Sequence, residues 1–249
     1  MSEVALLAFE RVERRHRSGR EPVAVLRDVS FALWPGELVA ILGPRRAGKT
    51  TLLRIAAGLE RPDAGSVRLD GRALDELPAG ERTRRLRAVG LAPKHWRVAR
   101  GKPVLDHVAL PLLAEGRPLM TAMAKAHEAI ERVGAGDCAS AAVDELAPGE
   151  EARVALAQAL VREPRLLLVD EPGVLAAPDE REKLLALLRA IAAERPKLAL
   201  LVTARDVTGV TGASRVLTLD AGALRGAPGP AGAAVLPFRQ RAVAAAPTP

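Results

Sequence analysis

One stretch of eight residues constrains the fold more than any other part of the chain. It matches the pattern GxxxxGK[ST] and lies between an apolar run, Glu37–Leu42, and a stretch with helical periodicity, Thr51–Ala57. A strand, a glycine-rich turn and a helix start in this order form a loop whose backbone N–H groups bind phosphate oxygens. The candidate nucleotide-binding residues of this loop are Gly43, Pro44, Arg45, Arg46, Ala47, Gly48, Lys49, Thr50 and Thr51.

Two side chains of the loop have specific expected tasks. We expect Lys49 to reach the β- and γ-phosphates of a nucleotide, and the Thr50 hydroxyl to take one position on Mg²⁺. An ordinary turn rich in glycine and proline would match the same pattern if the pattern stood alone. The other motifs of the chain therefore have to decide between a nucleotide site and a simple turn.

A pair of carboxylates follows an apolar strand much later in the chain. The run Leu166–Val169 is entirely apolar and leads into Asp170 and Glu171. Parallel α/β sheets bind ligands at the carboxyl ends of their strands. Asp170 is suited to hold Mg²⁺ through water, and Glu171 is suited to activate an attacking water as the catalytic base. A solvated acidic turn is the alternative, but together with the phosphate loop the pair favours a nucleotide site.

The order of the predicted elements indicates an α/β fold. Short apolar or alternating runs bounded by turn residues predict strands, and apolar residues at helical spacing predict helices. The region from about Lys94 to Leu146 has a helical pattern. The predicted strands are Leu6–Val12, Val23–Leu33, Glu37–Leu42, Ser66–Gly71, Leu166–Val169, Leu198–Thr203 and Arg215–Leu219, and the predicted helices are Thr51–Ala57, Thr121–Val133, Glu150–Arg162 and Asp179–Glu194.

Composition and charge exclude several classes of protein. No apolar run reaches the roughly 20 residues needed to span a bilayer, and the first residues lack the features of a signal peptide. The single cysteine, Cys138, cannot form an internal disulfide, so we expect a soluble, intracellular domain. The net charge is +7, but the chain has only two Trp, three Phe and no Tyr. It therefore lacks the stacking aromatics of a single-strand nucleic-acid surface, while a basic face toward anionic lipid stays open.

The motif order resembles that of the nucleotide-binding subunit of an ATP-binding cassette (ABC) transporter over residues 5–225. The resemblance rests on the phosphate loop, the helical insert, Leu146–Glu150, Leu166–Pro172 and the strand that ends at Thr203. A further segment, Asp106–Leu112, is similar to the subgroup that serves lipoprotein release, macrolide export and cell division. The resemblance implies a P-loop NTPase core with an antiparallel β-subdomain. It also implies one domain at 1–225, with a helical subdomain inserted at about 94–148 and a flexible tail at 226–249.

The resemblance also implies cofactors, partners and a location. The cofactors are ATP and Mg²⁺, and the partners are a second ATP-binding subunit, identical or different, and membrane-spanning permease subunits that dock near Lys94. Nucleic acid is not an expected partner, and the expected place is the cytoplasmic face of the membrane. His16 would take the position of the aromatic residue that stacks on adenine. A solvated residue within the basic run Arg14–Arg17 is an equally good interpretation of His16.

The segment that should complete the partner's ATP site departs from the family pattern Leu-Ser-Gly-Gly-Gln/Glu. Its residues are Ala147, Pro148, Gly149 and Glu150. Ala147 lacks the hydroxyl that would contact the partner's γ-phosphate, and Pro148 has no N–H to offer an anion. Gly149 and the helix dipole remain. The alternative is that Pro148 simply starts a helix, a position that proline favours.

Other positions of the chain also depart from the family pattern. Lys94 aligns with the Q-loop glutamine, Ala204 with the switch histidine and Val174–Ala177 with the D-loop. Arg46 stands where the family usually has glycine, so it either strains the loop or grips a phosphate with its guanidinium. Loss of one preorganised transition-state donor typically costs about 2.7–4 kcal/mol. We therefore expect an ATP-binding subunit that hydrolyses ATP slowly.

Two alternatives remain at this stage. The first is a catalytically impaired pseudo-ATPase that binds ATP as a regulatory or scaffolding subunit. The second is a soluble ABC protein that acts on nucleic acid, and it ranks last because such proteins usually carry two cassettes or large insertions. The steady-state rate of ATP turnover separates a working ATPase from a pseudo-ATPase.

Overall fold

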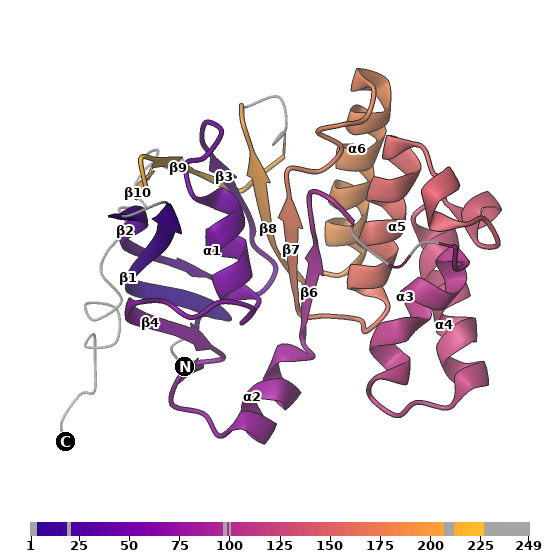
Figure 1. The fold of residues 1–249 in the computed structure, drawn as a ribbon, viewed down its shortest axis with the longest axis horizontal. Helices are drawn as coiled ribbons and strands as arrows, with labels where there is room; N and C mark the ends of the chain where they lie inside the picture. Colours follow the sequence, from indigo (N-terminus) through magenta and orange to yellow (C-terminus); the bar gives the residue numbers. More distant parts are fainter. Residues whose placement is uncertain (1–3, 19–20, 97–98, 100, 207–211, 227–249) are drawn as a thin grey trace, which may run out of the picture.

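Two sheets and a group of helices make up the part of the chain that the computed structural model describes, residues 4–18, 21–96, 99, 101–206 and 212–226 (Figure 1). One sheet is mixed and mostly parallel, and the other is antiparallel. This arrangement confirms the predicted α/β class with an antiparallel β part. Apart from Gly226, the predicted flexible tail lies outside the described residues.

A six-stranded sheet in the order β10-β9-β3-β8-β7-β6 supports the predicted site. The strand β3 pairs in parallel with β8 and β9, and β7 pairs in parallel with β6 and β8, whereas β10 is antiparallel to β9. The carboxyl ends of β3, β8 and β7 therefore lie next to one another at one edge. The strands are β3 Leu38–Leu42, β6 Val89–Ala92, β7 Leu166–Asp170, β8 Ala199–Ala204, β9 Arg215–Asp220 and β10 Ala223–Gly226.

The strand β7 is apolar throughout because both of its faces are covered. Leu166 and Leu168 belong to a core shared with helix α1 (Lys49–Ala56) and the antiparallel sheet. Leu167 and Val169 belong to a second core with helices α5 (Pro148–Leu160) and α6 (Pro178–Glu194). A strand buried on both faces shows a continuous apolar run rather than an alternating one. The same run delivers Asp170 and Glu171 to the edge of the sheet.

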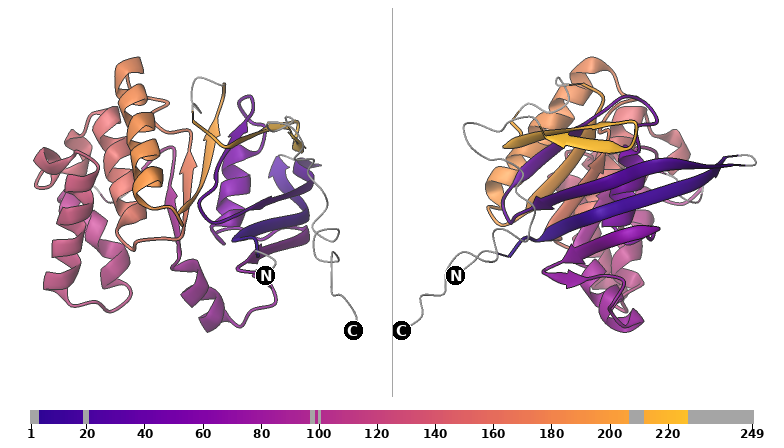
Figure 2. Two further views of the ribbon diagram at one scale, coloured as in Figure 1. Left: turned by 180° about the vertical axis from the view of Figure 1, so that it is seen from behind. Right: turned by 90° about the vertical axis from the view of Figure 1, so that its left-hand side faces the viewer.

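The antiparallel sheet, in the order β2-β1-β4-β5, packs on the other side of α1 (Figures 1 and 2). Its strands are β1 Leu7–Ser18, β2 Glu21–Leu33, β4 Ala64–Leu69 and β5 Arg72–Ala73. Inside the sheet the ring of Phe9 stacks on that of Phe31, with 4.9 Å between centroids. Beyond Val12, β1 continues as a ribbon with β2, which Figure 2 shows as a long projecting pair. The sequence prediction ended β1 at Val12 because the charged residues that follow carry no apolar alternation.

Helices α3 (Val104–Leu113) and α4 (Leu119–Arg132) pack with α5 beyond strand β6 (Figure 1). Their shared core contains Val104, Val108, Ala122, Ala126 and Ile130, all fully buried. The assignment of about 94–148 as a separate subdomain stays a prediction. The short helix α2 (Ala79–Leu86) was not predicted. No described helix has both the length and the apolar character needed to cross a membrane.

Candidate functional site

The phosphate loop connects β3 to α1 at the carboxyl edge of the sheet. Its first residue, Gly43, donates its N–H to the carbonyl oxygen of Ala204 on β8 at 3.1 Å. A Cβ on Gly43 would lie 2.2 Å from the carbonyl oxygen of Leu219. Gly48 has a φ of 106°, and a Cβ there would lie 2.6 Å from the carbonyl oxygen of Val25. Both positions therefore require glycine, one for close backbone approach and one for its conformation as well.

The ammonium group of Lys49 lies inside this loop. Its Nζ donates to the carbonyl oxygens of Gly43 at 2.6 Å and Pro44 at 2.9 Å, and it lies 3.0 Å from Glu171 Oε1. Only 3% of the side chain is exposed. A buried cation with these partners sits where the sequence places a phosphate-binding lysine, at the start of α1.

The remaining loop residues divide into a buried and an exposed set. Arg46 has a φ of 68°, a left-handed conformation that favours glycine. This backbone agrees with the expected strain at the position where the family usually has glycine, and phosphate binding by the guanidinium stays a prediction. The buried residues are Gly43, Ala47, Gly48, Lys49 and Thr51, and the exposed ones are Pro44, Arg45, Arg46 and Thr50.

The two predicted metal ligands meet between α1 and β7. Thr50 Oγ1 donates to Asp170 Oδ2 at 2.7 Å. The other carboxylate oxygen of Asp170 accepts a hydrogen bond from Thr203 Oγ1 at 2.8 Å, which fixes its orientation. Nucleotide-bound Mg²⁺ typically uses only one or two protein oxygens and fills its shell with phosphates and water. This pair fits that requirement, and the described residues contain no group of three or more His, Cys, Asp or Glu able to hold a metal by themselves.

Glu171 lies among three cations. Its Oε2 accepts hydrogen bonds from Lys94 Nζ at 2.8 Å and from Arg205 Nε at 3.2 Å, and its Oε1 lies 3.0 Å from Lys49 Nζ. Burial alone would raise the pKa of Glu171, but hydrogen bonds from Lys94 and Lys49 lower the pKa to about 2. The side chain is therefore an ionised carboxylate at physiological pH. Its low pKa makes it a weaker proton acceptor than a base tuned near neutrality.

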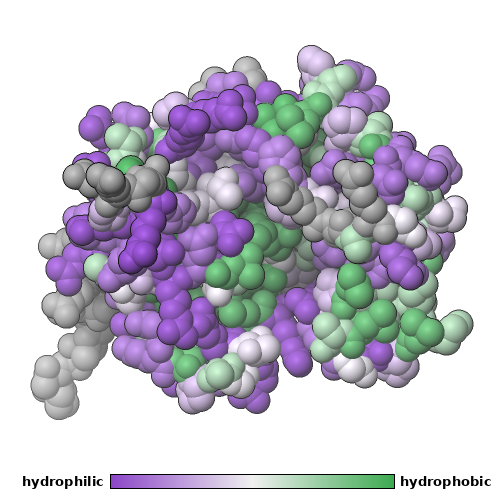
Figure 3. All heavy atoms as spheres, in the orientation of Figure 1, coloured by the Kyte–Doolittle hydropathy of each residue, from purple (hydrophilic) through white to green (hydrophobic). Residues whose placement is uncertain are grey.

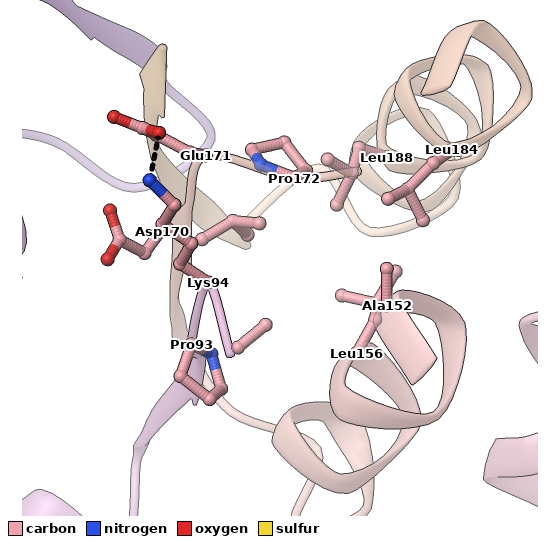
Figure 4. Close-up of a pocket in the computed structure, with 11 residues that line it drawn as sticks. Pro93, Lys94, Ala152, Leu156, Asp170, Glu171, Pro172, Leu184 and Leu188 are labelled. Carbon is pink, nitrogen blue, oxygen red and sulfur yellow. Dashed lines mark hydrogen bonds and ion pairs between the residues drawn. The ribbon is translucent and has the colours of Figure 1, made fainter. Parts of the chain in front are cut away.

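The segment that carries Lys94 is anchored to helix α5. Two residues after Lys94, Trp96 donates its backbone N–H to Glu151 Oε1 at 2.8 Å and its indole N–H to Gln158 Oε1 at 2.9 Å. Figure 4 shows Lys94 reaching Glu171 beside a small pocket of about 20 Å³. Apolar side chains of α5 and α6, including Ala152, Leu156, Leu184 and Leu188, line the pocket. The position expected for a glutamine thus carries a cation that is held in place.

The four residues expected to face a partner's site lie at the start of α5. Ala147 and Pro148 are exposed, and Gly149 and Glu150 are half-buried. Ala147 donates its N–H to Glu150 Oε2 at 2.8 Å. Among the described residues no hydrogen bond or ion pair joins this segment to the phosphate loop of the same chain. The D-loop segment begins with half-buried Val174, and its next residue, Leu175, is 56% exposed.

His16 contributes to an ionic cluster around Glu60. Its Nε2 lies 3.3 Å from Glu60 Oε2, and the same carboxylate contacts Arg14 and Arg54. Arg14 also pairs with Asp63 at 2.8 Å. His16 therefore has a structural partner, and its stacking on adenine stays a prediction.

We expect Glu60→Gln to destabilise the protein at neutral pH and less so in acid. Burial raises the pKa of Glu60, but hydrogen bonds from Arg54 and His16 more than offset this and hold the pKa below its usual value. A carboxylate with a lowered pKa stabilises the fold above its unfolded-state pKa and loses this effect as the pH falls below it. The loss in free energy of unfolding should be about 1 kcal/mol at neutral pH.

Urea unfolding at neutral pH and in acid below the unfolded-state pKa measures this difference. The exposed Glu76 offers a matched control, Glu76→Gln, which should change the free energy of unfolding little at either pH. An equal loss for Glu60→Gln at both pH values would contradict the expectation.

Sequence reasoning missed the role of Arg205 and of Thr203. Arg205 directly follows β8 and binds Glu171, and the Thr203 hydroxyl accepts the backbone N–H of Glu171 at 3.0 Å. A charged residue just after a predicted buried strand was the available signal for Arg205. Thr203 was read only as the end of a strand, because a buried threonine does not by itself indicate which side chain it contacts.

Comparisons with known proteins agree on one family. A family model described as ABC transporter matches residues 26–174. The methionine import ATP-binding protein MetN of Mesorhizobium japonicum is 36% identical over 85% of this chain, and the chain spans 57% of that protein. The lipoprotein-releasing system ATP-binding protein LolD of Chromohalobacter salexigens is 36% identical over 88% of this chain and 92% of its own length. The second relative confirms the expected likeness to the lipoprotein-release subgroup.

Solved structures agree with this result. The dimeric structure of MJ0796, a bacterial ABC transporter cassette, superposes with a TM-score of 0.80 at 26% identity, covering 88% of this chain and 96% of the other. A dimeric post-hydrolysis state of the same cassette bound to ADP and Pi gives a TM-score of 0.81 at 25% identity, covering 90% and 99%.

Proposed function

The chain belongs to the ABC transporter family, and we propose that it is the ATP-binding subunit of a transporter or a related membrane complex. The observation that carries this proposal is the meeting of Thr50, at the end of the phosphate loop, with Asp170, at the end of β7. In this arrangement the loop N–H groups and Lys49 would bind phosphates, and Thr50 and Asp170 would hold Mg²⁺. The metal ion would neutralise charge on the bound phosphates. Glu171 would orient and deprotonate the attacking water.

Two subunits and a membrane partner complete the proposed assembly. Solved relatives of this cassette are dimers, and the residues Ala147–Glu150 would face the ATP bound by the second subunit. Permease subunits would dock near Lys94, on the segment that Trp96 joins to α5 by two hydrogen bonds. The assembled chain would lie on the cytoplasmic face of the membrane. ATP binding would close the dimer and bias the conformation of the membrane subunits.

Three features of the described residues favour slow hydrolysis of ATP. In the extreme case the chain would bind nucleotide without turning it over. Glu171 is held by three cations and has a pKa of about 2. Ala204, at the position of the switch histidine, is a buried methyl group that packs against Ala40. Ala147 and Pro148 supply neither the hydroxyl nor the N–H that the family offers to the partner's phosphate. ATP binding depends mainly on the loop N–H groups, Lys49, Thr50 and Asp170, so these three features should weaken binding less than turnover.

The test measures nucleotide binding by the chain and steady-state ATP turnover of its complex with the membrane partner. Glu171→Gln, which lacks the proposed catalytic base, serves as the reference for zero turnover. We expect clear ATP binding and a turnover only slightly above that zero. Failure to bind ATP would contradict the proposed function, whereas a turnover far above the zero would contradict only the slow hydrolysis.

A further inference from the structure

Positive charge exceeds negative charge among the described contacts of Glu171. Lys49, Lys94 and Arg205 all contact the carboxylate of Glu171. A second carboxylate, Asp170, is joined to Glu171 through the Thr203 hydroxyl. Three positive groups thus face two negative ones. A partly buried site with excess positive charge favours an additional anion.

The position of the bound carboxylate indicates where such an anion would fit. The carboxylate of Glu171 contacts Lys49 with one oxygen and Lys94 with the other. A second small anionic group that displaced it could therefore contact both ammonium groups. Because Lys49 belongs to the phosphate loop, this place lies at the phosphate end of the proposed nucleotide site. A terminal phosphate carries more negative charge and more acceptor oxygens than a carboxylate, so it would compete well for the same cations.

The cation of Lys94 is also preorganised. Its side chain is 20% exposed, and its backbone lies two residues after Ala92, the last residue of β6, and two residues before the anchored Trp96. Arg205 is 45% exposed and follows the last residue of β8 directly. Both cations thus approach Glu171 from the ends of strands. Little ordering should be needed for them to bind a phosphate.

We propose that Lys94, assisted by Arg205, exchanges Glu171 for the terminal phosphate of the bound nucleotide, so that this chain selects nucleoside triphosphate over diphosphate even without Mg²⁺. The proposal rests on the proposed function, because it concerns the same nucleotide site. The exchange moves two cations from a carboxylate to a phosphate and breaks no covalent bond. It also releases Glu171 toward its expected role as a base. The alternative is that Lys94 only braces Glu171 and never contacts nucleotide.

The test is competition binding to the full-length protein with a fluorescent ATP analogue, displaced by ATP or by ADP, in Mg²⁺ and in excess EDTA. We expect the wild-type protein in EDTA to bind ATP about tenfold or more tightly than ADP. Lys94→Gln, which introduces the family's residue, should lower the affinity for ATP in EDTA by about tenfold. It should change the affinity for ADP by less than about twofold, because ADP lacks the terminal phosphate.

Three variants sharpen the comparison. Lys94→Arg keeps the charge and should retain most of the preference for ATP. Lys102→Gln makes the same exchange as Lys94→Gln at an exposed lysine of the connection between β6 and α3 and should leave both affinities unchanged. Glu171→Gln removes the competing negative charge and should raise the affinity for ATP in EDTA. A thermal unfolding curve for each variant verifies that it is folded.

The outcomes separate this inference from the proposed function. If Lys94→Gln leaves the affinity for ATP in EDTA unchanged, or lowers the affinities for ATP and ADP equally, Lys94 does not select the terminal phosphate and the inference is wrong. Equal wild-type affinities for ATP and ADP in EDTA would also overturn it, while strong binding of both in Mg²⁺ would leave the proposed function intact. A protein that binds neither nucleotide even in Mg²⁺ would overturn both.

Discussion

Lys49→Ala is expected to lower the affinity for ATP by about a hundredfold or more. The side chain of Lys49 is only 3% exposed, and its ammonium already has two carbonyl oxygens and a carboxylate as partners. Hydrogen bonds to charged groups typically contribute about 1.5–3 kcal/mol each, and a buried lysine that meets two phosphates makes more than one. A tenfold change corresponds to about 1.4 kcal/mol. Equilibrium binding of a fluorescent ATP analogue in Mg²⁺ measures the loss.

The control for this prediction is Lys197→Ala, which removes an exposed lysine and should leave the affinity unchanged. Thermal unfolding of Lys49→Ala separates a lost ligand contact from a lost fold. Because Glu171 keeps Lys94 and Arg205 as partners, we expect the variant to stay folded. An affinity within about threefold of the wild type would exclude Lys49 from the phosphate site and contradict the nucleotide-site interpretation.

The central part of the fold could be predicted because local signals and tertiary structure agree there. The strand predicted at Leu166–Val169 is β7, Leu166–Asp170, and the helix predicted at Asp179–Glu194 is α6, Pro178–Glu194. In the first case burial on both faces produces an unbroken apolar run, and in the second Pro178 marks the first turn. The phosphate loop and the acidic pair were likewise recognisable, because their glycines, lysine and carboxylates occupy fixed positions along the chain.

Other parts could not be predicted because no local pattern encodes them. The helix α2, Ala79–Leu86, has no buried residue, so it carries no apolar stripe for a sequence reading to detect. The outer half of β1 depends on pairing with β2 rather than on burial. The cation cluster at Glu171 joins Lys94 and Arg205, which precede and follow it by 77 and 34 positions. The order of strands in the sheet brings these residues together, and that order cannot be read from spacing alone.

The double variant Ala147→Ser, Pro148→Gly is expected to raise ATP turnover of the assembled complex by about tenfold to a hundredfold. It returns a hydroxyl and a backbone N–H to the segment that faces the partner's phosphate. A preorganised donor of this kind is typically worth about 10²–10³ in kcat, and the weak base Glu171 and the missing switch histidine should limit the gain. Both substituted residues are exposed, so the fold should tolerate the change. The measurement is steady-state phosphate release, with Glu171→Gln as the zero.

The chain supplies a matched control at Ala142. Like Ala147, this residue precedes a helical turn and donates its N–H to a glutamate three residues later, Glu145 Oε2 at 3.0 Å. Ala142→Ser therefore matches the Ala147→Ser part of the double variant at a residue with the same N–H contact, and it should leave turnover unchanged. Ala204→His is a poorer choice for restoring activity, because Ala204 is 3% exposed and an imidazole would overpack its surroundings. If the double variant turns over no faster than the wild type while remaining folded, the limiting defect lies at Glu171 with its three cations or at Ala204 rather than in the partner-facing segment.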